Sequence, residues 1–342
     1  MTEHAIEARD VELTYADGTE AVRGVDLTVP KGEFFGFLGP NGAGKTTTIK
    51  ILATLLNPTG GEVTVNDFDV RTQARSVRAS IGYMPQETSI DPELTARENL
   101  RFACESYGVP RGERDERIAE LLDLVDLADV AEKRADGFSG GMRKRLDAAT
   151  ALVHRPPLVF LDEPTTGLDP KARNRLWEYF ERINDAGTTI FLTTQYLEEA
   201  DQLCDRIGVI KDGAIVAEGS PAELKRRVGG EILDIELPDG ADARERAAEV
   251  AHESDLFESG VTIDVTDDGI SITSERARSK GTDLLVALKD EGLAVTGFNI
   301  RAPTLDDVFL AITGEHASDV EGRTDGEAGD IDDAAAGTEV VQ

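Results

Sequence analysis

Residues 39–46 read Gly-Pro-Asn-Gly-Ala-Gly-Lys-Thr, and this stretch decides the fold. It fits the pattern GxxxxGK[ST], in which glycines let the backbone come close to phosphate oxygens. An apolar run at residues 34–38 precedes it, and a stretch of helical character at residues 45–56 follows. Strand, glycine-rich loop and helix in this order form a phosphate-binding unit, because free N–H groups at the helix start face the phosphates. This context disfavours the alternative of a purely structural glycine turn, so the sequence predicts an α/β nucleotide-binding protein.

Within this unit the side chains divide the expected work. Lys45 supplies a full positive charge for the β- and γ-phosphates, and the Thr46 hydroxyl is an expected ligand of Mg²⁺. The candidate residues for nucleotide binding in the loop and first helical turn are Gly39, Pro40, Asn41, Gly42, Ala43, Gly44, Lys45, Thr46 and Thr47.

A second apolar run, residues 158–161, ends in Asp162 and Glu163. Open α/β sheets bind their ligands at the carboxyl ends of the strands, so both carboxylates are expected at the nucleotide. We expect Asp162 to hold the Mg²⁺ shell and Glu163 to act as the general base that polarises the attacking water. An acidic pair after a strand is, taken alone, more often a solvated strand end. Its position after a phosphate-binding loop favours the catalytic interpretation.

Length and composition set the broad class. A chain of 342 residues allows one large domain and a smaller appended one. The first ten residues are polar, and no apolar run approaches the roughly 20 residues that cross a bilayer, so we expect a soluble, non-secreted protein. Only Cys104 and Cys204 are present, and they lack disulfide or zinc-ligand spacing, which favours buried thiols in a reducing cytoplasm.

The formal net charge is −31, from 67 acidic and 36 basic residues. Such a surface repels nucleic acid, so direct nucleic-acid binding is disfavoured. One interpretation is adaptation to a salt-rich cytoplasm, where screening reduces the repulsion between like charges. An ordinary acidic surface is the alternative.

The pattern along the chain predicts a cassette over residues 1–228. Residues 5–29 alternate apolar and polar and break at residues 17–18, which predicts antiparallel strands. Residues 94–154 are helical in character, with a capping box at Thr95 and Glu98, and form an insertion over about residues 87–150. Later segments alternate strand (158–162, 188–193, 206–210) and helix (170–185, 196–203). We therefore expect a mixed sheet core, an antiparallel β subdomain and a helical insertion.

The character changes after residues 229–230. Strand candidates near 231–236, 261–265, 270–274 and 294–300 alternate with helices near 241–252 and 279–291, in the βαββαβ order of ferredoxin-like domains. An amphipathic segment at residues 304–312 completes an accessory α+β domain over residues 231–314. Residues 315–342 are acidic and nearly free of large apolar residues, so we expect a disordered tail.

Residues 138–142, Phe-Ser-Gly-Gly-Met, resemble the signature sequence of ABC (ATP-binding cassette) ATPases. The resemblance implies a P-loop NTPase fold of the ABC type. In that family Ser139, Gly140 and Gly141 contact the γ-phosphate of ATP bound to the partner subunit. It therefore implies a homodimer, or a dimer with a similar subunit, that forms two composite ATP sites.

Further positions resemble family motifs one by one. Tyr15 resembles the aromatic residue that stacks on adenine, although a tyrosine in a strand is as often a core residue. Gln86, in residues 83–86, resembles the glutamine loop that contacts Mg²⁺ and the water and leads into the insertion that docks the permease. Asp169 resembles a member of the loop between the two ATP sites. Thr46, Gln86 and Asp162 are thus the expected metal ligands.

Gln195 departs from the wider family, which carries a histidine at this position. Together with residues 143–147 and 303–310, Pro-Thr-Leu-Asp-Asp-Val-Phe-Leu, it resembles the daunorubicin-resistance (multidrug exporter) subfamily. Gln195 joins Glu163 and Gln86 as an expected catalytic residue, with capping of the following helix as the alternative. The subfamily favours export of an apolar compound.

The resemblance implies an ATP-hydrolysing subunit that uses ATP and Mg²⁺, lies in the cytoplasm on the inner face of the cell membrane, and drives a separate integral-membrane permease. The alternative is a soluble ABC ATPase that acts on ribosomes or DNA without a permease. A single set of motifs, the lack of sustained heptads and the acidity disfavour it. A regulator that does not hydrolyse ATP would lack Glu163, which is present.

Overall fold

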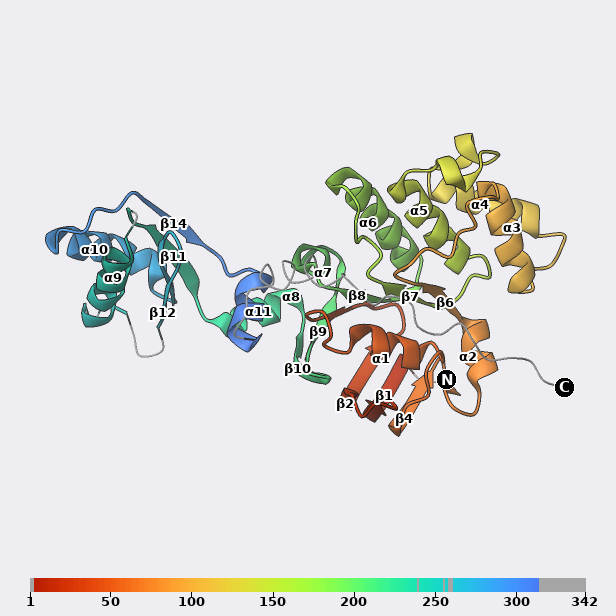
Figure 1. Cartoon of the computed structure of the whole chain (residues 1–342), viewed down its shortest axis with the longest axis horizontal. Helices are drawn as coiled ribbons and strands as arrows, with labels where there is room; N and C mark the ends of the chain where they lie inside the picture. The colour runs from red at the N-terminus through yellow and green to blue at the C-terminus, as the bar shows by residue number, and fades with distance from the viewer. Residues whose placement is uncertain (1–2, 239, 255, 258–260, 314–342) are drawn as a thin grey trace, which may run out of the picture.

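The computed structural model describes residues 3–238, 240–254, 256–257 and 261–313 (Figure 1). The expected tail at 315–342 lies outside the described residues. A large layered body holds residues up to about 228, and a small α/β body lies at the other end of the molecule. Within the described residues no helix is both long and apolar enough to cross a bilayer.

One layer of the large body is an antiparallel sheet in the order β2-β1-β4-β5, formed by β1 (His4–Thr14), β2 (Glu20–Pro30), β4 (Gly60–Val65) and β5 (Phe68–Asp69). The first two strands form the predicted hairpin, with Val11 opposite Val25. The sequence prediction did not include β4, β5 or the short helix α2 (Ala74–Ser80), because each is short and β4 begins with two glycines.

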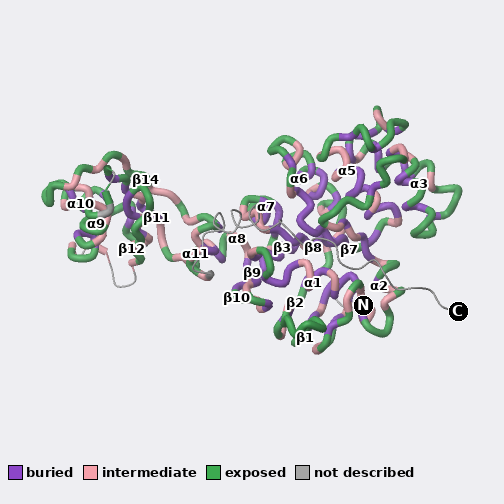
Figure 2. Tube along the Cα trace, in the orientation of Figure 1, coloured by how far each residue is buried: buried purple, intermediate pink, exposed green. Residues whose placement is uncertain are grey.

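The central sheet has six strands in the order β10-β9-β3-β8-β7-β6. All neighbours are parallel except β9 and β10. The strands are β3 (Phe34–Leu38), β6 (Ile81–Met84), β7 (Leu158–Asp162), β8 (Thr189–Thr194), β9 (Arg206–Lys211) and β10 (Ala214–Gly219). Every residue of β3, β7 and β8 is buried. This burial on both faces explains why these strands do not alternate apolar and polar residues. Figure 2 shows this buried core between the flanking layers.

The helix α1 (Lys45–Leu52) follows β3 directly and ends four residues before the predicted end at 56. Thr54 leaves the helix with a φ of +62°. The amides of Leu55 and Leu56 then both bond to the Lys50 carbonyl instead of continuing the helical ladder. The left-handed residue therefore ends the helix, which periodicity alone could not show.

A helical layer lies on the other side of the central sheet from β1 and β2 (Figure 1). It contains α3 (Ala96–Ser106), α4 (Arg114–Leu124), α5 (Gly140–Ala151) and α6 (Pro170–Asp185), with short 3₁₀ turns at 128–130 and 135–137. The predicted capping box of α3 is present, since the Thr95 hydroxyl accepts from the Glu98 amide and the Glu98 carboxylate accepts from the Thr95 amide. The helices α7 (Leu197–Leu203) and α8 (Pro221–Val228) complete this body.

The small body is an antiparallel sheet in the order β12-β13-β11-β14, covered by two helices. Its elements are β11 (Glu231–Glu236), α9 (Ala241–Glu253), β12 (Thr262–Val265), β13 (Gly269–Ser274), α10 (Ala277–Asp290) and β14 (Gly297–Arg301). The chain order βαββαβ and this strand order are those of the predicted ferredoxin-like domain.

The last helix, α11 (Leu305–Thr313), returns to the large body and packs against α7 and α8 (Figure 1). Its residues Leu305, Val308 and Phe309 are buried in the same apolar core as Leu203 and Leu224. The sequence grouped this segment with the accessory domain, because amphipathicity shows that a helix has a buried face but not which core buries it.

Arg301 connects α11 to the small sheet. Its guanidinium donates to Asp234 on β11 at 2.8 Å and to both carboxylate oxygens of Asp307 on α11 at 2.7 and 3.0 Å. A bidentate arginine–carboxylate pair fixes orientation as well as distance. The accessory domain is thus joined to the large body at both of its ends, through α8 and through α11.

Candidate ATP site

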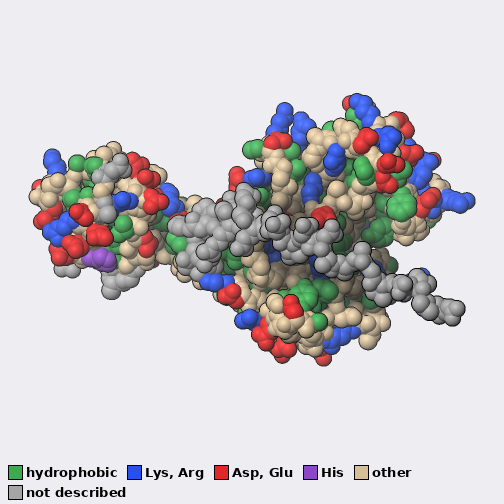
Figure 3. Space-filling model, viewed as in Figure 1, with side chains coloured by type: hydrophobic (Ala, Val, Ile, Leu, Met, Phe, Trp, Pro, Cys, Tyr) green, Lys and Arg blue, Asp and Glu red, His purple; other side chains and the backbone are tan. Residues whose placement is uncertain are grey.

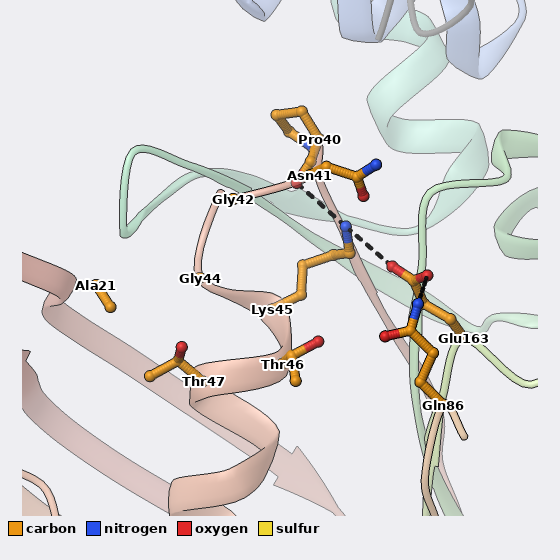
Figure 4. A pocket seen from close by; sticks show the side chains of 10 residues that line it. All are labelled: Ala21, Pro40, Asn41, Gly42, Gly44, Lys45, Thr46, Thr47, Gln86 and Glu163. Carbon is orange, nitrogen blue, oxygen red and sulfur yellow. Dashed lines mark hydrogen bonds and ion pairs between the residues drawn. The ribbon is translucent and has the colours of Figure 1, made fainter. Parts of the chain in front are cut away.

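A pocket of about 270 Å³ opens at the carboxyl ends of the central strands (Figure 4). It is lined by the glycine-rich loop, by the start of α1, by one residue of β2 and by residues that follow β6 and β7: Ala21, Pro40, Asn41, Gly42, Gly44, Lys45, Thr46, Thr47, Gln86 and Glu163. Nearly all of these were predicted from the sequence. Gly39 and Ala43 belong to the same loop but do not line the pocket.

The loop can only be built with glycine at several positions. A Cβ on Gly39 would lie 2.4 Å from the Ile210 carbonyl oxygen, and one on Gly44 would lie 2.5 Å from that of Ala21. Gly44 also has a backbone φ of +106°, a value that residues other than glycine rarely adopt. The loop is therefore pressed against its surroundings on one side, which leaves its backbone free to face a phosphate chain on the other.

Lys45 points into this pocket from the first turn of α1 and is only 4% exposed. Its ammonium donates to the carbonyls of Gly39 at 2.7 Å and Pro40 at 3.1 Å, and it lies 3.4 Å from a Glu163 carboxylate oxygen. Burial lowers the pKa of Lys45, while the charges of Glu163 and Asp162 oppose that shift. A cation held among acceptors in a polar pocket is suited to bind anionic oxygens.

Glu163 lies directly after β7, where the chain turns sharply with a φ of +48°. One carboxylate oxygen faces Lys45, and the other accepts from the Gln86 amide at 3.1 Å. Gln86 lies after β6, and its backbone carbonyl accepts a hydrogen bond from the Lys144 ammonium of α5 at 2.6 Å. Three elements distant in sequence thus bring Lys45, Gln86 and Glu163 together, as the resemblance implied. Lys144 was missed, since its motif position gives no sign of a contact with the loop.

Asp162 is 1% exposed and lies behind Thr46 instead of lining the pocket. Its Oδ1 accepts from the Thr46 hydroxyl at 3.3 Å and from the Thr193 hydroxyl at 2.6 Å. Burial first, and then the charge of the Asp162 carboxylate, raise the pKa of Tyr83 well above its ordinary value. The sequence prediction did not include Thr193 or Tyr83. Only the expectation that β6 and β8 pair with β7 could have indicated that these residues lie near Asp162.

The donor set suits Mg²⁺. Thr46, Asp162 and Gln86 all offer oxygen atoms, and the described part of the chain has no group of three or more His, Cys, Asp or Glu side chains arranged for a metal. Mg²⁺ is typically held by one or two carboxylates together with substrate phosphates and water, so these residues fit an ion that arrives with a nucleotide.

The signature residues lie elsewhere. Ser139 is the N-cap of α5, where its hydroxyl accepts from the Met142 amide at 3.3 Å, and Asp169 is the N-cap of α6. Both are exposed, and both line a second pocket of about 220 Å³ that shares no residue with the first. The second pocket is lined by Ser139, Gly141, Met142, Arg145, Asp169, Lys171, Ala172 and Arg175. Gly140 follows Ser139 in the chain and is also exposed, but it does not line this pocket.

Two further predicted residues do not line the first pocket. Tyr15 is 39% exposed and its hydroxyl bonds to that of Thr47 at 3.1 Å, so the alternative of a core tyrosine is wrong. Gln195 does not line the pocket, and its side-chain oxygen is buried without a hydrogen-bond partner among the described residues. The N-cap of α7 is Tyr196, without a side-chain cap, so Gln195 does not cap that helix.

Two family models match the chain. Residues 22–166 match the ABC transporter model, and residues 219–313 match the model of the C-terminal domain of DrrA1-3-like ATP-binding proteins.

The chain is 43% identical to the daunorubicin/doxorubicin resistance ATP-binding protein DrrA of Streptomyces peucetius, over 92% of this chain and 94% of the relative. It is 35% identical to the linearmycin resistance ATP-binding protein LnrL of Bacillus subtilis, over 92% and 100%. Among solved structures, a dimeric post-hydrolysis state of the ATP-binding cassette MJ0796 with ADP and Pi has a TM-score of 0.58 and 29% identity, over 63% of this chain and 98% of that one. The chain is thus an ATP-binding and ATP-hydrolysing member of the ABC transporter family, and within it belongs to the daunorubicin-resistance ATP-binding proteins.

Proposed function

We propose that the chain powers export of a drug or another lipophilic compound through a separate integral-membrane permease, to which it binds on the cytoplasmic face. The convergence of Lys45, Gln86 and Glu163 in one pocket carries this proposal, in a chain whose relatives are resistance and export ATP-binding proteins. None of those relatives is named for action on ribosomes or DNA, so the alternative gains no support.

In the proposed mechanism the backbone N–H groups of residues 41–44 and the Lys45 ammonium bind the β- and γ-phosphates. Mg²⁺, when bound by Thr46, Asp162 and Gln86, would neutralise charge on the phosphate oxygens. Glu163 orients the attacking water and accepts its proton, while the Gln86 amide holds the other carboxylate oxygen of Glu163.

At the rim of the same pocket, Tyr15 stacks on the adenine, and Thr47 fixes the tyrosine hydroxyl. Gln195 donates a further hydrogen bond near the γ-phosphate through its side-chain NH2 group. We therefore assign Glu163, Gln86 and Gln195 to the reaction.

We further propose that two copies of the chain form each ATP site. The pocket with Lys45 and the pocket with Ser139, Gly141 and Asp169 share no lining residue, so one chain does not bring both sets to one nucleotide. The exposure of Ser139, Gly140 and Asp169 leaves them accessible to a second copy. The dimeric form of the MJ0796 cassette supports this arrangement.

Two features of the chain outside the ATP site enter the proposal. We assign residues 1–228 to the cassette, with the insertion at 87–150 as the part that contacts the permease, and the domain within 231–314 to modulation of assembly. Figure 3 shows acidic and basic side chains interspersed over the visible face of both bodies. The net charge of −31 supports a protein adapted to high salt, with no affinity for nucleic acid.

The experiment is co-expression with the membrane protein encoded by the adjacent gene, in a drug-sensitive host. We expect resistance from the parent pair, none from a pair carrying Glu163→Gln, and full resistance from Glu62→Gln, which changes an exposed carboxylate of β4 outside the insertion. Resistance that persists with Glu163→Gln would show that hydrolysis at this site does not drive export.

A further inference from the structure

A buried threonine contacts the carboxylate of Asp162 and the backbone amide of Glu163. Thr193 is fully buried, with no exposed surface, and lies near the end of β8, directly opposite Asp162 of the parallel strand β7. It does not line the nucleotide pocket, so it cannot touch the substrate. Any influence on the reaction must therefore act through the residues that Thr193 contacts.

The Thr193 hydroxyl has one proton and two neighbours that accept it. It lies 2.6 Å from Asp162 Oδ1 and 3.4 Å from the Leu161 carbonyl oxygen. The shorter distance is typical of a charge-assisted bond from a hydroxyl to a carboxylate, so the proton is donated to Asp162. This leaves the lone pairs of the same oxygen available as acceptors.

The same threonine also holds Glu163. The Glu163 amide donates to the Thr193 carbonyl at 3.0 Å and approaches the Thr193 hydroxyl oxygen at 3.3 Å. Glu163 has a φ of +48°, a conformation that is strained for a residue with a side chain and persists only where its surroundings fix it. Thr193 thus fixes the backbone that aims the Glu163 carboxylate at Lys45 and Gln86.

We propose that Thr193 is a positioning residue for ATP hydrolysis, whose single hydroxyl couples the orientation of Asp162 to that of Glu163. The inference rests on the roles of Asp162 and Glu163 proposed above. The Thr46 hydroxyl also donates to Asp162, but of these two hydroxyls only that of Thr193 also accepts from the Glu163 amide.

The coupling has a consequence for metal binding. Without the Thr193 donor, Asp162 Oδ1 is free to rotate toward the Thr46 hydroxyl, and its geometry toward Mg²⁺ is no longer fixed. Partners that orient a metal ligand are typically worth about 10- to 100-fold in metal affinity or activity. Loss of the Thr193 hydroxyl should therefore weaken the contribution of Mg²⁺ to nucleotide binding and slow turnover, while binding of nucleotide without Mg²⁺ is unchanged.

The test compares Thr193→Val, which keeps the shape and removes the hydroxyl, with Thr193→Ser, which keeps the hydroxyl. Two quantities are measured in the full chain: ATP turnover, and the ratio of the dissociation constants of fluorescent ADP in EDTA and in Mg²⁺. We expect valine to lower both turnover and this ratio by about 10- to 100-fold, and serine to restore both to near the parent values. If valine does not fold, Thr193→Ala and Thr193→Ser form a second pair that differs only in the hydroxyl.

Thr189→Val is the matched control. Thr189 is the first residue of the same strand, is 1% exposed, and its hydroxyl accepts from the Gly32 amide at 2.8 Å, away from the carboxylates. The Thr189→Val variant should leave unchanged both ATP turnover and the ratio of the ADP dissociation constants in EDTA and in Mg²⁺.

The inference is overturned if Thr193→Val keeps parent turnover and ratio, if serine is as impaired as valine, or if Thr189→Val has the same effect. The Glu163→Gln variant distinguishes a failure of the proposed catalytic site from a failure of the role of Thr193 alone. If it keeps parent turnover, the proposed catalytic site itself is wrong; if it abolishes turnover while Thr193→Val does not, only the role of Thr193 fails.

Discussion

The helix α11 should stabilise the ATP-binding body although it follows the accessory domain in the chain. Phe309 is 3% exposed and lies in the core that also contains Leu203 of α7 and Leu224 of α8. Removing a buried phenylalanine side chain typically costs about 3–5 kcal/mol, because apolar burial is lost and a cavity remains. We therefore expect Phe309→Ala to lower the free energy of unfolding of the large body by about 3–5 kcal/mol.

Urea unfolding followed by tryptophan fluorescence measures this directly. The only tryptophan, Trp177, is buried in α6 and donates to Glu199 of α7 at 3.0 Å, so its signal reports the large body and not the accessory domain. With a denaturant slope of about 3 kcal/mol per molar, the midpoint should fall by about 1–1.7 M. Phe298→Ala on β14 is the control, since that ring is 60% exposed and its loss should cost less than about 0.5 kcal/mol. Equal midpoints for the two variants would refute the packing of α11 on this core.

Four further outcomes follow from the site and the surface. Gln195→Ala should lower turnover by roughly 10- to 1000-fold with little change in ATP affinity. Gln195→His should keep much of the activity and add a pH dependence between about pH 6 and 7.5, and steady-state kinetics across pH measures both variants. Lys144→Met should lower turnover by roughly 10-fold, because the Gln86 carbonyl loses its donor; steady-state kinetics with a circular-dichroism folding control checks this. Burial alone would raise the pKa of Asp307, but Arg301 and the neighbouring hydrogen bonds outweigh it and hold that pKa below its ordinary value of 3.8. Since the folded pKa is depressed, this contribution to stability is full above about pH 4 and lost as the pH falls through the folded value, so Arg301→Leu should destabilise the protein at pH 7 and not near pH 2 in thermal unfolding. The midpoint of thermal unfolding should rise between low salt and molar KCl, because screening reduces repulsion within a chain of net charge −31.

The sequence predicted those parts of the fold that depend on local pattern. The loop from Gly39 to Thr46 requires a strand before it and a helix after it, and both are present. The continuous apolar run before Asp162 is a strand buried on both faces, as its composition indicated, and the strand predicted at 188–193 is present as β8.

Contacts between distant segments could not be predicted in the same way. The bond from Thr193 to Asp162 depends on the register of β8 against β7, which no local pattern specifies. The docking of Phe309 on the large body depends on a return of the chain after the accessory domain. The early end of α1 depends on one left-handed residue, Thr54. The first two are tertiary effects that extend a correct local prediction, and the third is a local backbone conformation that periodicity does not show.

The most direct test of the account is the mass of the Glu163→Gln variant by light scattering, with and without ATP and Mg²⁺, in high salt. The variant removes the proposed base and keeps Lys45, so ATP should accumulate between two chains and double the mass. Adding Ser139→Arg, which changes an exposed residue of the second pocket, should leave the same variant monomeric. A Glu163→Gln protein that binds ATP yet stays monomeric, both alone and with its permease, would contradict the shared ATP site.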